Sequence, residues 1–387
     1  MQSALKHTGR SKSVLLAPPR NRGTARPFAG LLASRRLVAA LCLAITALAV
    51  ACSSSGSSQK GSQRSVRIGL FPNVTHAPGI LCYERGAFEA QLRSESRPGR
   101  DRGIEVKLFD SGPQAIEAIF SGAIDIAYIG PGPALNGFLR SQGQALRIVA
   151  GATSGGASFV VQPEIASVFD LAGKVIATPQ LGNTQDIAAR AWLKRNGFKT
   201  DPAQGGDVTI APRPNPQIVD AFRNREIAGA WVPEPWASRL VVEYGGKVLV
   251  DERELWPKGL FSTTVVVATP AFIQSDLDAL VAILVAHLQC IDSLNSSDLA
   301  SVSEARRSVE TWLGRTVGKS LPKEVTERAW SELTFTADPL LDTIVQTGAK
   351  AVEEGLLPPF DNSSIEGFVD PRPLDRAYET IQALSQK

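Results

Sequence analysis

The chemistry that this sequence offers best is the binding of an anion by neutral donors. Gly182, Asn183 and Thr184 stand between a predicted strand and a predicted helix. Glycine lets a ligand approach the backbone there, and the free N–H groups of a first helical turn attract negative charge. Gly130 and Pro131 follow another predicted strand and offer the same chemistry. The alternatives are an N-cap without a ligand role at Asn183 or Thr184, and an ordinary Gly-Pro turn at Gly130.

Two further segments supply neutral donors. Asn73 and His76 lie in the loop 72–78, which two prolines stiffen. We predict that this loop forms one wall of a pocket, and simple capping of the next helix is the alternative. Thr153 and Ser154 open a segment rich in hydroxyl groups and glycine, 153–158. We expect that segment to be a turn between two lobes that donates to an oxoanion, and a polar linker is the alternative.

The hexapeptide 231–236 is the most specific string in the chain. It places Trp231, Glu234 and Trp236 directly after a predicted strand, with prolines on both sides of the glutamate. Tryptophan is costly to expose, so each indole fills the core or faces a pocket. We predict that Glu234 binds a ligand amine or a backbone N–H, and that Trp236 lines the apolar part of a ligand. The sequence leaves open whether Trp231 points into the core or into the cleft.

Catalytic and metal-binding patterns are missing from the sequence. It contains no GxSxG, P-loop or HExxH motif, and His76 has no evident nucleophile as a partner. We therefore predict a protein that is not an enzyme and needs no metal or cofactor. Beyond residue 52 the cysteines are Cys82 and Cys290, without CxxC spacing. They are either one disulfide or two buried thiols, and we favour the thiols.

The beginning of the chain has the pattern of a lipoprotein signal peptide. Arg35 and Arg36 precede an uncharged run, Leu37–Ala51, that ends in small residues before Cys52. About 15 apolar residues are few for a membrane span and suit a signal peptide. We predict cleavage after residue 51, lipid attachment at Cys52, and a flexible tether over 52–65. A plain signal peptide or a single-span anchor with an incidental Cys52 is the alternative.

The charge of the chain is concentrated in that leader. Residues 1–51 hold eight Lys and Arg and no acidic residue. Removing those eight from the chain's 41 Lys and Arg leaves 33 against 38 Asp and Glu, a formal net charge of −5. The overall charge of +3 is therefore no argument for nucleic-acid binding, and we expect none.

Short strands alternate with helices from residue 66 onward. Strands are predicted at 66–71, 104–109 and 124–129, with helices at 81–91 and 113–121. A second alternating unit follows, and helices dominate after residue 270, beginning with one predicted at 270–293. This pattern predicts an α/β fold of two lobes with a ligand cleft between them. The expected parts are lobe 1 over 66–152, lobe 2 over 153–260, and a return to lobe 1 with C-terminal helices over 261–387.

The chain resembles the solute-binding proteins of ABC importers for aliphatic sulfonates, within the nitrate, sulfonate and taurine group. Its fold would then be that of a type II periplasmic binding protein. The resemblance covers residues 66–260 and reaches the Gly-Leu-Leu-Pro string at 355–358. It is carried by four strings: Phe71-Pro-Asn-Val-Thr-His-Ala-Pro, Gly122-Ala-Ile-Asp-Ile-Ala-Tyr-Ile-Gly-Pro, Thr178-Pro-Gln-Leu-Gly-Asn-Thr-Gln-Asp and Gly229-Ala-Trp-Val-Pro-Glu-Pro-Trp.

The resemblance implies a monomer, lipid-anchored on the outer face of the cell membrane, that delivers a small organic anion to a permease driven by an ATPase. The sulfonate head would take donors from 153–155 and 182–184, and Trp236 and Phe71 would face the organic tail. No basic side chain is evident in the predicted cleft. Nitrate, another oxoanion or a pyrimidine precursor remains an alternative ligand. An enzyme of cofactor biosynthesis on the same scaffold, or a signalling receptor, remains an alternative function.

Overall fold

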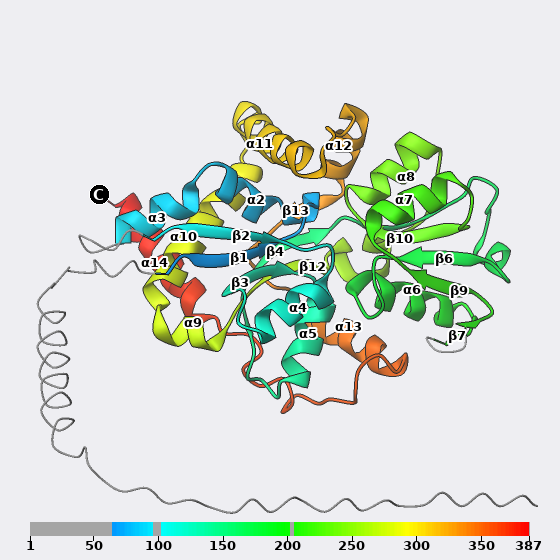
Figure 1. The fold of residues 1–387 in the computed structure, drawn as a ribbon, viewed down its shortest axis with the longest axis horizontal. Helices are drawn as coiled ribbons and strands as arrows, with labels where there is room; N and C mark the ends of the chain where they lie inside the picture. The colour runs from blue at the N-terminus through cyan, green and yellow to red at the C-terminus, as the bar shows by residue number, and fades with distance from the viewer. Residues whose placement is uncertain (1–63, 96–101, 202–204, 387) are drawn as a thin grey trace, which may run out of the picture. The chain divides into compact units, whose positions relative to one another are not determined.

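The computed structural model describes residues 64–95, 102–201 and 205–386. The predicted signal peptide, Cys52 and all but the end of the predicted tether lie outside the described residues. The described chain forms two mixed β-sheets with helices packed on both faces, which confirms the predicted α/β class (Figure 1). We call each sheet with its helices a lobe, the first and the second.

The first sheet has six strands in the order β13-β4-β12-β3-β1-β2. Its strands are β1 (Val66–Leu70), β2 (Ile104–Leu108), β3 (Ile126–Ile129), β4 (Arg147–Gly155), β12 (Ser262–Ala268) and β13 (Leu333–Phe335). β1 pairs in parallel with β2 and β3, whereas β12 runs antiparallel between β3 and β4. The central strands β3 and β12 are buried along their whole length, as expected where helices cover both faces of a sheet.

The second sheet has five strands in the order β11-β5-β10-β6-β9. Its strands are β5 (Ala157–Val161), β6 (Val175–Thr178), β9 (Thr209–Pro212), β10 (Gly229–Pro233) and β11 (Lys247–Asp251). β6 is parallel to β9 and β10, so their carboxyl ends meet at one edge. A separate two-stranded ribbon consists of β7 (Thr200–Asp201) and β8 (Gly205–Gly206).

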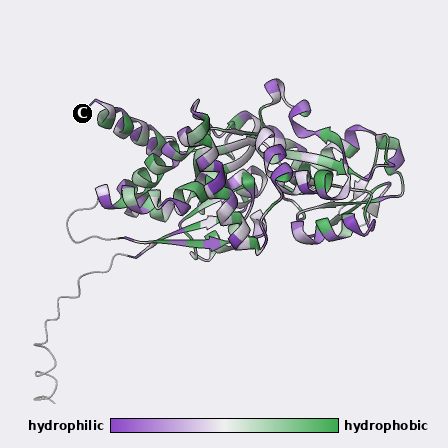
Figure 2. Cartoon of the chain, turned by 90° about the horizontal axis from the view of Figure 1, so that it is seen from above, coloured by the Kyte–Doolittle hydropathy of each residue, from purple (hydrophilic) through white to green (hydrophobic). Residues whose placement is uncertain are grey.

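Amphipathic helices cover both sheets, and Figure 2 shows hydrophilic and hydrophobic residues alternating along them. The first lobe holds η1 (Val74–His76), α2 (Ala77–Glu84), α3 (Ala87–Glu95), α4 (Gly112–Phe120) and α5 (Pro131–Arg140). The second lobe holds η2 (Val168–Leu171), α6 (Thr184–Arg195), α7 (Asn215–Arg223) and α8 (Trp236–Tyr244). The remaining helices are α9 (Pro270–Ser275), α10 (Leu277–Leu294), α11 (Leu299–Val317), α12 (Lys323–Ser331), α13 (Leu341–Glu353) and α14 (Arg372–Ser385).

The chain crosses from the first sheet to the second between β4 and β5. Gly155 and Gly156 make this crossing with φ angles of 79° and 69°, a region that favours glycine. Thr153 and Ser154 are therefore the end of a strand, not part of the turn predicted for 153–158. The chain returns to β12 through the short helices η3 (Glu252–Leu255) and η4 (Pro257–Gly259).

Helix α10 is the central helix of the first lobe's core. Its composition would suit a membrane span, with a mean hydropathy of 1.7 over 18 residues, but 72% of it is buried inside the fold. No other helix in the described ranges meets that test of length and composition. On α10, His287 bonds the Tyr128 hydroxyl and the Gly151 carbonyl, both at 2.9 Å. Burial lowers the pKa of His287 to about 4, so it is a neutral structural residue.

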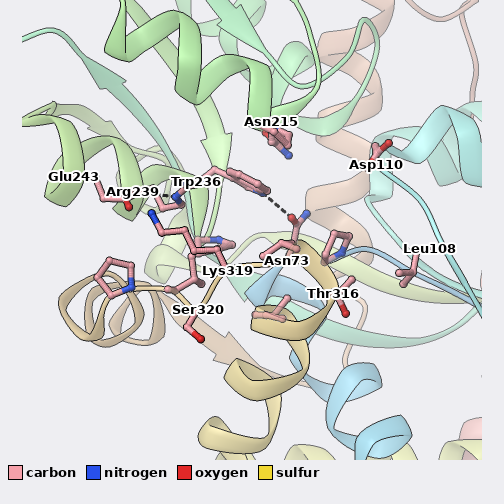
Figure 3. Close-up of a pocket in the computed structure, with 17 residues that line it drawn as sticks. Asn73, Leu108, Asp110, Asn215, Trp236, Arg239, Glu243, Thr316, Lys319 and Ser320 are labelled. Atoms are coloured by element: carbon pink, nitrogen blue, oxygen red, sulfur yellow. Dashed lines mark hydrogen bonds and ion pairs between the residues drawn. The ribbon is translucent and has the colours of Figure 1, made fainter.

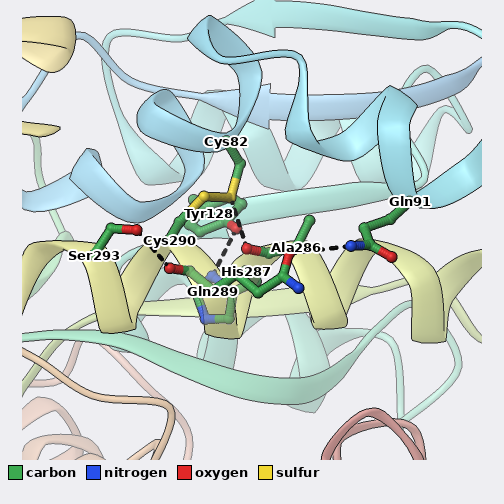
Figure 4. Close-up of a disulfide and its surroundings, with 8 residues drawn as sticks. All are labelled: Cys82, Gln91, Tyr128, Ala286, His287, Gln289, Cys290 and Ser293. Atoms are coloured by element: carbon green, nitrogen blue, oxygen red, sulfur yellow. Dashed lines mark hydrogen bonds between the residues drawn. A yellow bond between two sulfur atoms is a disulfide. The ribbon is translucent and has the colours of Figure 1, made fainter. Parts of the chain in front are cut away.

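A disulfide joins α2 to α10. Cys82 and Cys290 are bonded, with their Cα atoms 5.9 Å apart (Figure 4). The expectation of two buried thiols is therefore wrong. The sequence separation of 208 residues hides this pairing from sequence patterns, because α2 and α10 meet only through tertiary packing.

Two predicted helices are interrupted in the structure. The helix predicted for 81–91 is split into α2 and α3 at Gly86, whose φ is 64°. The one predicted for 270–293 is split into α9 and α10 at Asp276, whose side chain accepts from the Ala279 N–H and caps α10. β4, β5 and α14 were not identified from the sequence.

Candidate ligand-binding site

A small cavity of about 40 Å³ lies between the lobes, and we call it the inner chamber. Most of the segments that line it follow β1, β2 and β3 of the first sheet and β6 and β9 of the second, and the end of β10 and two threonines of β12 complete the lining. Ligands of open α/β sheets bind at the carboxyl ends of parallel strands, which is this position. The lining residues are Phe71, Asn73, Thr75, His76, Asp110, Ser111, Gly112, Gly130, Pro133, Pro179, Asn183, Thr184, Gln185, Asn215, Pro233, Thr263 and Thr264.

Helices α4, α5, α6 and α7 begin at the inner chamber. Ser111, Gly130 and Asn183 are the N-cap residues of α4, α5 and α6, and Asn215 is the first residue of α7. Each helix N-terminus carries free N–H groups and the positive end of a helix dipole. No Lys or Arg is among the described lining residues, so an anion here would be held by neutral donors.

Three buried polar atoms on the chamber wall have no hydrogen-bond partner. They are Ser111 Oγ, Asn215 Oδ1 and Thr264 Oγ1. A buried polar group without a partner costs free energy, so such groups are rare unless something else satisfies them. The hydroxyl groups can donate, and the Asn215 amide can turn to present its NH₂. Together they make a set of donors that a bound oxoanion would satisfy.

His76 is a neutral donor at this wall. Its Nδ1 accepts from the Phe71 N–H at 3.3 Å, and its ring stacks on the Phe71 ring with centroids 4.5 Å apart. Burial lowers the pKa of His76 to about 3, because a charged imidazole is poorly solvated there. With Nδ1 occupied as an acceptor, the ring proton is on Nε2. This is the chemistry of a positioned hydrogen-bond donor.

The two lobes approach closely at Gly130 and Thr184. The Thr184 hydroxyl accepts from the Gly132 N–H at 3.4 Å, which connects α5 with α6. A Cβ atom at Gly130 would lie 2.6 Å from Thr184 Oγ1, so only glycine permits this approach. Asn183 caps α6 by accepting from the Asp186 N–H at 2.8 Å and also lines the chamber. Asn183 therefore both caps α6 and lines the inner chamber.

Six predicted site residues lie outside the lining of the inner chamber, and one of them, Trp236, lines an adjoining cavity described below. The Thr153 hydroxyl donates to the Thr75 carbonyl at 2.7 Å, and the Ser154 hydroxyl accepts from the Phe261 N–H at 3.1 Å. Both hydroxyls therefore hold neighbouring segments in place. The other three are Pro131, the first residue of α5; Gly182, whose N–H donates to Asp186; and Glu234.

Glu234 is completely buried beside the crossing between the lobes. Its backbone N–H donates to the Gly156 carbonyl at 2.8 Å, and its Oε2 accepts from the Ser238 N–H at 3.0 Å. Its Oε1 has no partner. Burial raises the pKa of Glu234 to about 7, and the Ser238 N–H opposes that rise. The carboxylate supports the start of α8 and does not line the inner chamber.

The two tryptophans of the hexapeptide have different environments. Trp231 is in the core of the second lobe, stacked on Phe159 at 5.5 Å, and its Nε1 donates to Glu252 at 2.8 Å. Trp236 begins α8 and its Nε1 donates to the Asn73 Oδ1 at 2.7 Å, which joins the second lobe to the first (Figure 3). Trp231 is therefore structural, whereas Trp236 faces a cavity.

That cavity, the outer chamber, has a volume of about 450 Å³ and adjoins the inner one. Asn73, Asp110 and Asn215 line both chambers. The lining also includes Arg239 and Lys319, so basic side chains do reach this part of the cleft, contrary to the sequence-based view. Arg239 pairs with Glu243 at 2.6 Å and lies over the Trp236 ring.

Three residues of the chamber wall were not predicted from the sequence: Ser111, Asn215 and Thr264. Each of these two residues, Ser111 and Asn215, follows a strand and stands at the start of a helix that has a proline in its first turn. This pattern could have identified both residues from the sequence. Thr264 gives no such signal, because it is one hydroxyl in a buried strand. Across the described residues no cluster of three or more His, Cys, Asp or Glu side chains could hold a metal ion.

Comparisons with known proteins place this geometry in context. A family model described as the NMT1-like family matches residues 59–309. The taurine-binding periplasmic protein of Escherichia coli is 29% identical over 178 residues, which are 45% of this chain and 53% of that protein. The chain thus spans about half the length of the curated relatives it matches.

Solved structures resemble this fold over a larger part of the chain than the curated sequence matches cover. The alkanesulfonate-binding protein SsuA from Xanthomonas axonopodis pv. citri, bound to MOPS, has a TM-score of 0.61 and 19% identity, covering 77% of this chain and 96% of that one. The periplasmic nitrate-binding protein NrtA from Synechocystis PCC 6803 has a TM-score of 0.67 and 15% identity, covering 82% and 88%. At these identities the likeness establishes the fold.

Proposed function

Because the chain belongs to the NMT1-like family, we propose that it is the extracytoplasmic solute-binding component of an ABC importer. It binds an aliphatic sulfonate or a similar small organic anion and delivers it to a membrane permease that an ATPase drives. The observation that carries this proposal is the inner chamber, where the N-termini of α4, α5, α6 and α7 meet three polar groups without a partner among the described residues. A sulfonate-type head has the negative oxygens that such donors satisfy.

The absence of a cation from the described lining fits a ligand that must later be released. A buried Lys or Arg would have to lose its partner each time the ligand left, and an unpaired buried charge costs several kcal/mol. Neutral donors lose much less, because a hydroxyl or amide without a partner costs about 1–3 kcal/mol. We infer reversible binding and not catalysis, since His76 is a neutral donor whose ring is not hydrogen-bonded to any hydroxyl of the described lining residues.

An organic anion is favoured over nitrate by the outer chamber. An inorganic oxoanion would occupy the inner chamber and leave the adjoining space of about 450 Å³ without a role. Taurine and alkanesulfonates are named for two of the related proteins, and they combine a sulfonate head with an organic part. Nitrate is named for a third, so it is the ligand that the experiment must exclude.

The membrane attachment is part of the same proposal. Cys52 would carry the lipid, and the mature protein would be a monomer on the outer face of the membrane. The Cys82–Cys290 disulfide supports an oxidising compartment, because disulfides are rare in the cytosol. A Cys52→Ser variant should lose the mass of the lipid and leave the membrane fraction or retain its leader. Unchanged lipid mass in that variant would contradict the assignment.

Ligand binding is tested by thermal unfolding of the purified full-length chain in mild detergent. The panel contains taurine, ethanesulfonate, butanesulfonate, nitrate, sulfate, bicarbonate and a pyrimidine precursor of thiamin. A ligand at 100 times its Kd adds about 2.7 kcal/mol of stability, which raises Tm by several degrees. We expect a shift with sulfonates, weakened in Ser111→Ala and retained in Ser385→Ala, whose exposed hydroxyl is on α14. A shift with nitrate alone, or with none of the panel, would refute the sulfonate assignment.

A further inference from the structure

A further cavity of about 410 Å³ lies between α6 and α13, and we call it the side pocket. Its walls come from the second half of α6, from η3 with the residue that follows it, and from the last turn of α13. α6 belongs to the second lobe, and α13 contacts both α6 and α5 of the first lobe (Figure 1). None of the residues that line the side pocket lines the inner or the outer chamber. It is therefore separate from the proposed oxoanion site.

The sequence of α6 makes room for this cavity. Ala188, Ala191, Trp192 and Arg195 recur at helical spacing, so they share one face of the helix, and all four line the pocket. The two alanines take up little space there. Trp192 is half-buried and meets the Phe159 ring edge to face, with centroids 5.6 Å apart. Contact with the core of the second lobe thus holds one indole at the edge of an open space.

A second indole lies across the pocket. Trp256 follows η3 and stacks on Phe261, with ring centroids 6.0 Å apart. Leu255 and Trp192 complete the apolar part of the lining. The volume falls in the range of pockets that enclose small organic ligands, and aromatic rings pack well against indoles. The organic group that suits this lining is therefore a flat ring system.

Two cationic side chains of the lining, Arg195 and Lys350, form no ion pair with any described residue. Lys350 Nζ lies over the Trp256 ring instead, 3.9 Å from its centroid. Burial lowers the pKa of Lys350, and nearby Arg195 lowers it further, whereas Glu252 and Glu353 oppose this change. A bound anion would stabilise both positive charges, because an opposite charge favours the ionised form of each group.

The charges of the whole lining also favour an anion. They come from three basic and two acidic side chains: Lys194, Arg195, Lys350, Glu252 and Glu353. Lys194 is neutralised by Glu354 at 3.2 Å, outside the pocket. Glu252 is 2% exposed, and burial raises its pKa to about 7, so it carries only part of a negative charge near neutral pH. The remaining excess is positive, and an organic cation would also have to compete with Lys350 for the Trp256 ring.

We propose that the side pocket is a second binding site of this protein, and that its ligand is a small aromatic anion such as an indolyl or aryl carboxylate. The ring lies against Trp192 and Trp256, and the carboxylate oxygens accept hydrogen bonds from Arg195 and Lys350. The site goes beyond the proposed function and does not depend on it, because no residue of the inner or outer chamber takes part.

The test is calorimetric titration of the full-length chain in mild detergent, with empty micelles as the blank. The probes are indole-3-acetate, indole-3-acetamide and tryptamine, which have similar shapes and are anionic, neutral and cationic. We expect one site for indole-3-acetate and roughly tenfold weaker binding of the acetamide, which lacks the charge-assisted hydrogen bonds. Tryptamine should give no binding heat. Equal affinity for all three probes, or no binding of indole-3-acetate at millimolar concentration, would overturn the inference.

A matched pair of arginines checks where the probe binds. Arg195 is the exposed last residue of α6 and lines the side pocket, whereas Arg223 is the exposed last residue of α7 and does not. We expect Arg195→Gln to weaken indole-3-acetate roughly tenfold and to leave the acetamide unchanged, and Arg223→Gln to change neither. Ala191→Phe, which fills the pocket, should abolish the binding of both probes. Unchanged affinity of indole-3-acetate in Arg195→Gln would overturn the inference even if Ala191→Phe does not fold, because the probe would then bind elsewhere.

Discussion

The burial of Glu234 makes the stability of the second lobe depend on pH. In the folded protein the pKa of this carboxyl is raised to about 7 from an ordinary value of 4.5, chiefly because burial disfavours the charged form. Arg328 lowers the pKa and Glu332 raises it, each as a smaller effect. Replacing Glu234 with glutamine removes the charge while it keeps the shape and the acceptor for the Ser238 N–H.

The sign and size of the effect follow from the two pKa values. Below pH 4.5 the carboxyl is protonated in both the folded and the unfolded state, so it does not affect stability. Between pH 4.5 and 7 the unfolded chain loses its proton first, and folding becomes less favourable as the pH rises. Above pH 7 both states are ionised and the full cost of about 3 kcal/mol remains.

Denaturant unfolding of the wild type and Glu234→Gln at pH 3.5, 6 and 8 measures this directly. We expect the two free energies of unfolding to agree at pH 3.5 and the variant to be more stable by about 3 kcal/mol at pH 8. Glu252→Gln is measured in the same way for comparison. Burial also raises the pKa of Glu252 to about 7, but the Glu252 Oε2 accepts a hydrogen bond from the Trp231 side chain. A Glu234→Gln effect of the same size at all three pH values would refute the reasoning, since it would come from packing and not from ionisation.

Three further predictions concern other parts of the fold. Replacing Cys82 and Cys290 with alanine should lower the free energy of unfolding by about 2–5 kcal/mol in denaturant titrations, and a reducing agent should then have no added effect. Thr264→Val should raise the stability of the ligand-free protein by about 1 kcal/mol while weakening the ligand in titration, because it removes a hydroxyl without a partner. Gly155→Ala should lower Tm more than Gly173→Ala: the φ angles are 79° and 71°, but only at Gly155 would the new Cβ lie 2.6 Å from a backbone oxygen, that of Glu332, whereas at Gly173 nothing lies within 4 Å.

The sequence predicted the parts of the site that follow directly from strand ends. Asn73, His76, Gly130, Asn183 and Thr184 line the inner chamber because loops after parallel strands converge at one edge. Local patterns are sufficient there, since glycine, a capping residue and the preceding strand lie within a few positions of one another. Their role in binding a ligand stays a prediction until it is measured.

The other features of the site depend on contacts between segments that are distant in the sequence. Thr153 has a hydroxyl group that could donate to a ligand. In the fold this hydroxyl donates instead to the Thr75 carbonyl, 78 positions away in the sequence. Thr264 is one of several hydroxyls in a buried strand, and only the packing leaves its oxygen without a partner. The same limit applies to the segment between α11 and α12, which reaches the outer chamber by tertiary packing alone.

The unpartnered polar groups of the inner chamber also affect how fast proteases degrade the protein. Ser111, Asn215 and Thr264 leave the empty protein with unmet hydrogen bonds, and a bound ligand would supply them. Proteases cut chains that open, and the fraction of open chains falls about tenfold for every 1.4 kcal/mol that a ligand adds. Loaded molecules would therefore be degraded more slowly than empty ones. The amount of this protein would then follow the supply of its ligand, without any change in the rate of its synthesis.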